Sequence, residues 1–316
     1  MSISVIIPNF NGKALLTQFL GGNLNEFKKS GVTEVIIVDD ASADGSVSYL
    51  QHHHPSVKLI INQSNHGFGK SCNIGIMAAK NPIILLLNND MKCLAFDPKL
   101  VSDDLERPDV FAISGQILRD IENEHGQVSQ MNEALNMGFF KGGWFSSELN
   151  EQVLDHTNAD KKTNILWACG GAMLMSKEKF IQLNGFDELF YPFYCEDLDL
   201  SYRAWKQGWQ SIYSPQLIFH HAHQSTIGHY FSKAFIDRTH LRNQYIFMWK
   251  NITDPTWILS HLGTVLLKIL TLQIRDIRAI LTALIRLPGI FKYRWQKMPD
   301  QKSDREILAQ WSHLVP

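Results

Sequence analysis

The sequence has few cysteines, almost no net charge and no cysteine-pair motif, and each shortage excludes a class of protein. Its cysteines lie far apart without a CxxC pair, which excludes a disulfide framework or a cysteine zinc site and favours a reducing cytoplasm. The 30 Lys and Arg residues are balanced by 31 Asp and Glu residues. The chain therefore has no overall basic field, and we expect no nucleic acid partner.

Long apolar runs and a leader segment are also missing. The chain enters the short apolar run Ile3–Pro8 without a basic region or a cleavage site, so we predict no signal peptide. Charges interrupt every apolar stretch before the roughly 18 to 20 residues that a bilayer requires. The candidate near the end, Pro255–Leu267, stops at Lys268. We therefore predict no transmembrane span, although 316 residues with 45% apolar content can bury a sizeable core.

Short apolar runs are present, and they alternate with helix-like segments. Four runs have the length and composition of buried strands: 3–8, 34–39, 57–62 and 82–88. The segments between them that resemble helices are 13–29, 46–52 and 67–80. Strand and helix alternation predicts an α/β fold with a doubly wound, mostly parallel sheet.

The rest of the chain is less regular. We expect a variable insert over residues 103–162, because its sequence is polar and glycine-bearing. Further helices are predicted over 176–183 and from Glu196 to Gly208.

The last third carries a basic stripe. At spacings of three and four, one helical face holds Lys268, Thr271, Arg275, Arg278, Thr282 and Arg286. Ile, Leu and Ala surround the stripe, which suits amphipathic helices that lie in the plane of a membrane. The alternatives are a helix packed in the core and a dimer interface.

Polar side chains gather at the carboxyl ends of the four predicted strands. These ends carry Pro8, Asn9 and Asn11, the pair Asp39-Asp40, Asn62, and Asn88-Asn89-Asp90. Ligands of doubly wound sheets bind beyond the carboxyl ends of the strands. We therefore expect a ligand site at this edge.

Several motifs stand in an order that is known from one family. The segments are Val5–Asn11, Val38–Ser46, Asn65–Gly75, Leu87–Asp90, Gly170-Gly171, Phe186–Arg203 and Arg238–Asn243. Together they resemble family 2 glycosyltransferases of the GT-A fold, and most closely the bacterial rhamnosyltransferase-like members. The resemblance implies a catalytic domain over residues 1–250, with a nucleotide-binding half (1–100) and an acceptor half (101–250). Residues 251–316 form the C-terminal helical segment.

The resemblance implies a nucleotide-sugar donor at the strand ends. Asp39 accepts a hydrogen bond from the base, and Pro8, Asn9 and Asn11 form the other wall of the nucleotide slot. The glycine-spaced segment places Asn65, Gly67, Lys70 and Asn73 at the donor, with Lys70 as a compensating charge. The alternatives are an Asp that caps a turn and a helix start that packs tightly through its glycines.

A divalent cation is implied as well. Asn88-Asn89-Asp90 occupies the place of the family's Asp-x-Asp motif, in which Asp90 binds Mg²⁺ or Mn²⁺ and Asn89 lies nearer the ribose or sugar. Asn88 departs from the motif and weakens the expected affinity. We choose His220 as a second ligand, with His221 and His223 as alternatives. These histidines are otherwise structural or solvated.

The same resemblance assigns the catalytic side. Asp197 is the expected general base, because direct displacement requires a carboxylate that takes the proton of the acceptor hydroxyl. Gly170, Gly171 and Glu196 are expected at the acceptor. The alternative is that Glu196 or Asp197 only caps a helix. Asp199 and Arg203, four residues apart, are expected to form a helix ion pair and are left out of the catalytic set.

The implied function is an inverting, non-processive glycosyltransferase of surface polysaccharide synthesis. The chain lacks the Gln-x-x-Arg-Trp motif of processive synthases. We expect a glycan or lipid-linked acceptor and a cytoplasmic protein on the inner face of the membrane, with contact through residues 256–297.

Two other enzyme classes and one non-enzymatic function are the alternatives to a glycosyltransferase. A nucleotidylyltransferase requires a basic, glycine-rich loop near the start, and a dehydrogenase requires GxGxxG after the first strand; neither is present. A degenerate nucleotide-sugar-binding scaffold is the non-enzymatic alternative, because Asn88 replaces an Asp.

Overall fold

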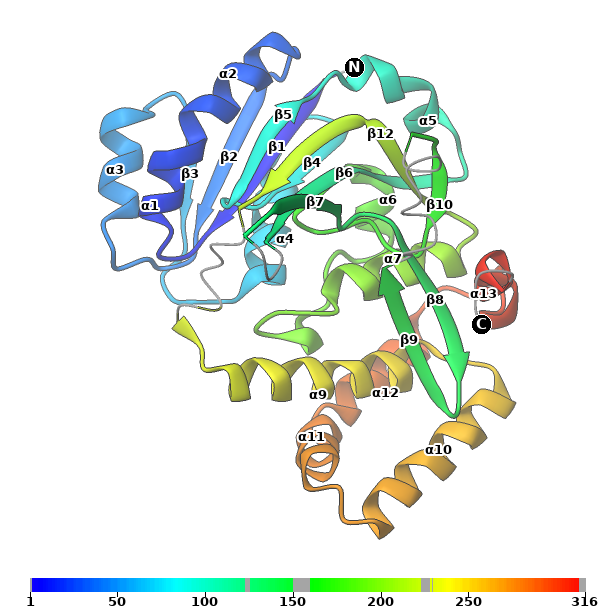
Figure 1. The fold of residues 1–316 in the computed structure, drawn as a ribbon. Coiled ribbons are helices and arrows are strands. Elements are labelled where there is room, and N and C mark those ends of the chain that lie inside the picture. The colour runs from blue at the N-terminus through cyan, green and yellow to red at the C-terminus, as the bar shows by residue number, and fades with distance from the viewer. Residues whose placement is uncertain (1, 123–125, 150–159, 223–227, 229, 313–316) are drawn as a thin grey trace.

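A mixed ten-stranded sheet forms the centre of the protein (Figure 1). The computed structural model describes residues 2–122, 126–149, 160–222, 228 and 230–312. Within these residues the strand order is β10-β12-β6-β11-β4-β1-β2-β3, with β5 paired to β12 and β7 to β6. The strands of this sheet are β1 (Ile3–Asn9), β2 (Glu34–Asp39), β3 (Lys58–Ile61), β4 (Ile83–Leu87), β5 (Met91–Ala95), β6 (Val110–Glu122), β7 (Val128–Asn132), β10 (Thr163–Ile165), β11 (Ala172–Ser176) and β12 (Gln210–His221).

The first ninety residues confirm the predicted parallel α/β half. Strand β1 pairs in parallel with β2 and β4, and β2 pairs in parallel with β3. Both faces of β1 are buried, since Val5 and Ile7 enter one core cluster and Ile6 another. A strand buried on both faces reads as a continuous apolar run. The helices here are α1 (Lys13–Leu15), which continues through a π-helical turn (Leu16–Leu20) into α2 (Gly21–Lys29), then α3 (Ser46–His53) and α4 (Phe68–Ala78).

The prediction of a variable insert over residues 103–162 is wrong over much of its length. Strand β6 lies inside the sheet between β11 and β12, and its first six residues are buried. Its apolar run, Val110–Ile113, is short and surrounded by polar residues, which hid it from the sequence pattern. A separate hairpin follows, formed by β8 (Asn136–Lys141) and β9 (Trp144–Leu149). The short helices before β6 are Pro98–Val101 and α5 (Ser102–Glu106).

Helix α7 (Glu196–Lys206) lies below the sheet and carries the Glu196-Asp197 pair at its start. The helix α6 (Lys177–Gln182) and a 3₁₀ turn (Glu188–Phe190) precede it. Both predicted helices are confirmed.

Among the described residues from 232 onward the chain forms helices α9 to α13, of which α9, α10, α11 and α12 extend below the sheet in Figure 1 and α13 lies beside the β8–β9 hairpin. Their bounds are α9 (Lys233–Asn251), α10 (Pro255–Leu270), α11 (Ile274–Leu284), α12 (Leu287–Gln296) and α13 (Asp304–Leu308), with a final 3₁₀ turn Ala309–Trp311. No helix among the described residues combines the length and the apolar character that crossing a bilayer requires.

The single basic stripe predicted from Lys268 to Arg286 is wrong. The chain breaks between α10 and α11 at Thr271–Gln273, where Leu272 has a φ of 52°. Lys268 turns inward and pairs with Asp276 at 2.5 Å.

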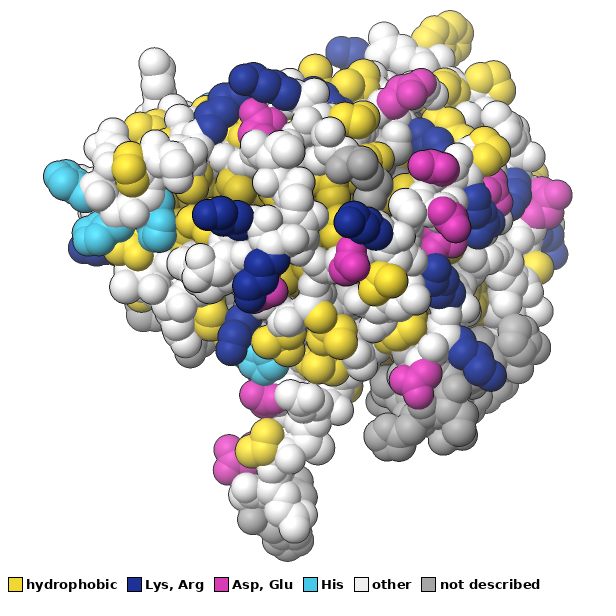
Figure 2. Space-filling view, turned by 90° about the horizontal axis from the view of Figure 1, so that it is seen from above, with side chains coloured by type: hydrophobic (Ala, Val, Ile, Leu, Met, Phe, Trp, Pro, Cys, Tyr) yellow, Lys and Arg dark blue, Asp and Glu magenta, His cyan; other side chains and the backbone are white. Residues whose placement is uncertain are grey.

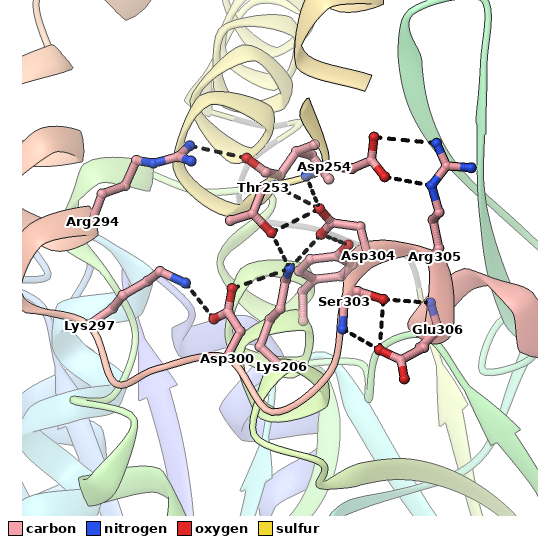
Figure 3. Close-up of polar contacts among 12 residues, drawn as sticks. Lys206, Thr253, Asp254, Arg294, Lys297, Asp300, Ser303, Asp304, Arg305 and Glu306 are labelled. Atoms are coloured by element: carbon pink, nitrogen blue, oxygen red, sulfur yellow. Dashed lines mark hydrogen bonds and ion pairs between the residues drawn. The ribbon is translucent and has the colours of Figure 1, made fainter. Parts of the chain in front are cut away.

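The last helix is fastened to α7 by one buried carboxylate (Figure 3). Asp304 is 1% exposed and accepts hydrogen bonds from the Tyr202 hydroxyl (2.6 Å) and the backbone N–H of Thr253 (2.6 Å). Lys206 pairs with the same carboxylate at 2.7 Å. Burial alone would raise the pKa of Asp304, but the Lys206 charge and these hydrogen bonds hold it below its usual value. The C-terminal helices therefore share a core with α7, and the predicted division at residue 250 stays a prediction.

Candidate functional site

A cleft opens at the carboxyl ends of β1, β2 and β4, where the strand-end residues were expected to meet. The residues that line it are Pro8, Asn9, Phe10, Asp40, Asn65, Gly67, Phe68, Ser71, Asn88, Asn89, Asp90, Pro192, Phe193 and Phe231. Six of the residues predicted for the donor, Pro8, Asn9, Asn65, Gly67, Asn89 and Asp90, therefore lie on one cleft.

Asparagine amides fix the ends of β1 and β4. Asn89 donates to the side-chain oxygen of Asn9 at 2.8 Å, and Asn9 donates to Asp39 at 2.8 Å. The second oxygen of Asp39 accepts the backbone N–H of Ser42 at 2.9 Å. Asp39 is fully buried behind the cleft wall, and its role as the base ligand stays a prediction.

Asp40 organises the loop before α4. Its carboxylate accepts the Asn62 amide (2.8 Å) and the backbone N–H groups of His66 (2.9 Å) and Gly67 (2.8 Å). A Cβ on Gly67 would lie 2.8 Å from the Tyr191 ring, and its φ is +82°, so only glycine fits here. Asp40 was predicted only as one of the polar residues at the ligand edge of the sheet, and its individual role comes from these contacts.

Three residues predicted at the donor lie elsewhere. The Asn11 side chain accepts the backbone N–H of Ala43 at 2.7 Å. Lys70 pairs with Glu188 at 3.4 Å on the exposed side of a neighbouring cavity. Asn73 exchanges two hydrogen bonds with the backbone of Phe186, at 2.8 and 2.9 Å. The Asn73 amide thus joins α4 to this loop away from the cleft lining, and its placement at the donor stays a prediction.

Two buried oxygens lie just after the end of β4. Both Asp90 Oδ1 and Asn88 Oδ1 are buried, and neither has a hydrogen-bond partner among the described residues. The other Asp90 oxygen lies 3.2 Å from His221 Nε2, and His221 Nδ1 lies 2.9 Å from Glu133. Burial alone would lower the pKa of His221, but hydrogen bonds and charges from Asp90 and Glu133 raise it to about 9. This corner therefore favours positive charge.

These residues fit a divalent cation of the Mg²⁺ or Mn²⁺ type. Carboxylate, amide and imidazole groups are ligands of such ions. The described residues contain no convergence of three His, Cys, Asp or Glu side chains, so an ion here would rely on the Asn88 oxygen and on its substrate. The choice of His220 is corrected: its ring pairs with Asp120 at 3.0 Å, while His221 faces Asp90. His223 lies outside the described residues.

The expected catalytic pair begins α7. Asp197 accepts the backbone N–H of Gly170 at 3.1 Å and that of Leu198 at 2.8 Å. Burial raises the pKa of Asp197, and these hydrogen bonds only partly oppose it. One buried oxygen of Glu196 has no partner in the part of the chain that the structure describes, and burial followed by the Asp197 charge raises its pKa well above the usual value.

The Gly170-Gly171 pair connects the catalytic and cation sides. Gly170 binds Asp197, while the carbonyl of Gly171 accepts the backbone N–H of Asn88 at 2.9 Å. A Cβ on Gly170 would lie 3.5 Å from Phe68, which lines the cleft. Because consecutive Cα atoms are about 3.8 Å apart, one short segment brings Asp197 to the Asn88–Asp90 end of the cleft.

Asn243 holds the loop that leads into α7. Its buried amide nitrogen lies 2.9 Å from the carbonyl oxygens of Phe190 and Phe193, and 2.8 Å from that of Tyr194. Tyr194 and Cys195 have positive φ values of 74° and 71°. Such conformations cost about 1–3 kcal/mol each and persist only where neighbours hold them. Sequence reasoning missed this role, although Asn243 belongs to a segment that carried the resemblance.

A buried ion network fixes α7 from behind. Asp199 is fully buried and binds Arg203 at 2.8 Å and Lys250 at 2.7 Å. Burial would raise the pKa of Asp199, but these two cations hold it below its usual value. Lys250 also pairs with Asp187 at 2.7 Å. The predicted Asp199–Arg203 pair is confirmed as part of this network.

Comparison with known proteins agrees with this arrangement. Residues 4–183 match the family described as "Glycosyl transferase family 2", and residues 155–231 match "N-terminal domain of galactosyltransferase". The chain belongs to glycosyl transferase family 2. Its GT-A fold, as predicted, is shared with a solved structure of GalNAc-T7 with UDP, GalNAc and Mn²⁺ (TM-score 0.59, 17% identity). That match covers 81% of this chain and 48% of the other.

The rhamnosyltransferase-like character is confirmed by curated family 2 relatives. The chain is 31% identical to rhamnosyltransferase WbbL of Escherichia coli, over 67% of this chain and 81% of the relative. It is 24% identical to the N-acetylglucosaminyl-diphospho-decaprenol L-rhamnosyltransferase of Mycobacterium tuberculosis, over 61% and 67%. A second GT-A neighbour is the mannosyltransferase PcManGT of Pyrobaculum calidifontis with GDP-Man and Mn²⁺ (TM-score 0.53, 15% identity, 89% and 86% covered).

Proposed function

We propose that this family 2 protein is an inverting, non-processive glycosyltransferase. It moves a hexosyl or deoxyhexosyl group, such as rhamnosyl, from a nucleotide-sugar to a hydroxyl of a glycan or lipid-linked glycan in surface polysaccharide synthesis. The observation that carries the proposal is the Gly170-Gly171 segment, which joins Asp197 to the cation corner at Asn88.

The chemistry is a single displacement. The acceptor oxygen attacks the anomeric carbon, the bond from that carbon to the donor diphosphate breaks, and Asp197 takes the hydroxyl proton. Its raised pKa makes Asp197 a stronger base than an ordinary aspartate. The protonated form of Glu196, favoured by its burial, donates a hydrogen bond to the acceptor.

Asp90, the Asn88 oxygen and the neutral form of His221 would hold Mg²⁺ or Mn²⁺, so His221 would give up a ring proton when the ion binds. A bound ion would neutralise charge on the diphosphate leaving group. The cleft residues Asn9, Asn65 and Asn89 orient the donor, with Asp39 at the base.

A group of three arginines supports the proposal that the acceptor is anionic. Half-buried Arg242 donates to the Tyr191 carbonyl at 2.5 Å, beside the loop that lines the cleft. Burial, followed by the charges of Arg286 and Arg238, lowers its pKa to about 10. None of these three arginines has a carboxylate partner among the described residues. Three cations without a counter-ion suit the diphosphate of a lipid-linked sugar, the acceptor class named for the mycobacterial relative. We therefore propose that the enzyme acts at the cytoplasmic face of the cell membrane.

The test is a donor screen with purified protein, Mg²⁺ or Mn²⁺ and a panel of nucleotide-sugars, read by thermal shift and by donor hydrolysis. One donor should raise the melting temperature in a metal-dependent way. Asp197→Asn should keep that shift and lose transfer by roughly 10²–10⁴-fold. Asp120→Asn, an exposed aspartate outside the cleft, is the matched control and should change neither.

Two results would count against the proposal. If no nucleotide-sugar binds with or without metal, the protein is not a transferase of this type. If a donor binds but Asp197→Asn leaves function in cells unchanged, the degenerate scaffold is correct. A nucleotidylyltransferase would instead turn over a nucleoside triphosphate with a sugar phosphate.

A further inference from the structure

Exposed apolar side chains are concentrated on the C-terminal helices. Between residues 259 and 298, fourteen large apolar side chains are exposed. They are Leu259, Leu262, Leu266, Leu267, Ile269, Leu270, Leu272, Ile274, Leu281, Leu284, Ile285, Phe291, Trp295 and Met298. The rest of the described chain has nine, scattered from Ile61 to Tyr230. A large contiguous apolar surface marks an interaction site in a water-soluble fold.

Helix α10 presents its two faces to different surroundings. Leu259, Leu262, Leu266 and Leu270 recur every three or four residues, so they share one face, and each is at least 56% exposed. The opposite face is used by the protein: Trp257 stacks on Phe140 of the β8–β9 hairpin at 4.5 Å between ring centroids.

The inward face of α10 is held by polar contacts as well. His261 lies 2.9 Å from the Gly143 carbonyl, and the Lys268 ammonium lies 4.4 Å from the Trp144 ring centroid. The helix is therefore anchored on its inner side, and its leucine stripe is displayed outward. No charged side chain lies on that stripe, because Lys268 is the one charged residue of α10 and it points inward.

The charges beside the stripe are almost all positive. Residues 255–300 contain seven Lys or Arg (Lys268, Arg275, Arg278, Arg286, Lys292, Arg294 and Lys297) and two acidic residues, Asp276 and Asp300, of which Asp300 pairs with Lys297 and Lys206. Asp276 is buried and bound to Lys268 and to the Tyr245 hydroxyl (2.7 Å). Arg278 shares the outer face of α11 with the exposed Leu281 and Ile285. An apolar face with basic neighbours is complementary to anionic lipid headgroups above an acyl layer.

We propose that the exposed face of α10, α11 and α12 docks on an anionic phospholipid bilayer, with its leucines at the boundary between headgroups and acyl chains. A second copy fits this face less well, because a two-fold interface would bring the same arginines together. The opposite end of the molecule, shown in Figure 2, mixes Lys and Arg with Asp and Glu and offers no such complement. Docking deepens the proposed function and rests on it for the lipid-linked acceptor. The carboxyl edge of the sheet and the helices α9–α11 lie at the same end of the molecule (Figure 1), so docking would turn the cleft edge toward the membrane.

The test measures sedimentation of the full chain with vesicles of phosphatidylcholine alone or mixed three to one with phosphatidylglycerol. Wild type should pellet with the anionic vesicles, and high salt should weaken this binding. The variant Leu262→Glu/Leu266→Glu should lose binding by about tenfold or more, because two leucines that would enter the lipid become charged. The matched control is Ile61→Glu/Met77→Glu, which changes two equally exposed apolar residues and should bind as wild type does.

Each outcome decides the proposal. Wild type that stays in the supernatant, or a leucine variant that binds unchanged, would overturn it. A dimer in solution that the leucine variant dissociates would assign the face to a second copy instead. Circular dichroism of the variant verifies its fold, and nucleotide-sugar hydrolysis without lipid tests the proposed function separately, because neither leucine lies at the cleft.

Discussion

The two walls of the site are built in different ways. On the donor wall, Asp39 ends β2 and Asp40 follows it, and both bind backbone N–H groups of loops at the carboxyl edge of the sheet. On the catalytic wall, Asp197 lies on a helix that depends on Lys250 and Asn243, which are some fifty residues away. The donor wall is therefore built from the ends of paired strands and the loops that follow them, whereas the catalytic wall depends on contacts that α9 makes with α7 and the loop before it. Loss of a contact from α9 should affect the catalytic wall far more than the donor wall.

The largest effect is expected from Lys250→Met. The change leaves Asp199 buried beside Arg203 alone and Asp187 without its cation, and breaking a buried pair costs about 3–5 kcal/mol. The free energy of unfolding, measured with denaturant, should fall by that amount. Lys233→Met, at the exposed start of the same helix, is the control. Equal stability of the two variants would show that the network does not hold α7.

A smaller effect on stability, but a specific one on rate, is expected from Asn243→Ala. The change leaves three carbonyls of the 190–194 loop without their donor, and the strained entry to α7 relaxes. A displacement of about 1 Å can cost up to 10²-fold, so kcat should fall while the KM of the donor stays near its wild-type value.

The donor-wall counterpart is Asp40→Asn, which weakens the grip on the His66 and Gly67 N–H groups. It should raise the KM of the donor and change kcat less. Steady-state kinetics of both variants provide the comparison. If the change in kcat relative to the change in KM were the same for Asn243→Ala and Asp40→Asn, the distinction between the two walls would be wrong.

The smallest effect is expected from Glu196→Gln, and it contrasts two carboxylates of α7, Glu196 and Asp199. The raised pKa of Glu196 means that its ionised form is disfavoured by folding, so folding stability decreases as the pH rises through that pKa. Glu196→Gln should therefore raise the melting temperature at pH 8 by roughly 1–3 °C and give little gain at pH 5. Asp199, with its lowered pKa, contributes in the opposite sense: its stabilisation is present at neutral pH and is lost as the pH falls.

Differential scanning at the two pH values checks this, with Glu188→Gln as an exposed control. A gain of the same size at both values would mean that charge is not the cause.

Much of the donor wall was predictable because its polar residues stand directly after apolar strand runs. The four apolar runs fix the strands, and the polar residues that end them must meet at one edge. The catalytic wall was predictable only through the family resemblance, because no sequence pattern near Asp197 predicts that Asn243 and Lys250 contact α7 and the loop before it.

The histidine ligand shows the limit clearly. Consecutive residues of a strand point to opposite faces, so the choice between His220 and His221 depends on the register of β12. That register shifts between Ile218 and Phe219, a bulge that no residue there signals. The break after α10 was missed for a similar reason, because Thr271–Gln273 contains neither glycine nor proline.

The Asp304 attachment has a consequence for how the protein is made. Trp205 and Lys206, at the end of the catalytic helix, pack on Trp311 and pair with Asp304, about one hundred residues later. Synthesis proceeds from the N-terminus, and nascent chains fold as their partners emerge. The donor wall can therefore assemble early on the ribosome, whereas the catalytic helix completes its contacts only after the last part of the described chain has been synthesised. Incomplete chains would then bind nucleotide-sugars before they can catalyse transfer.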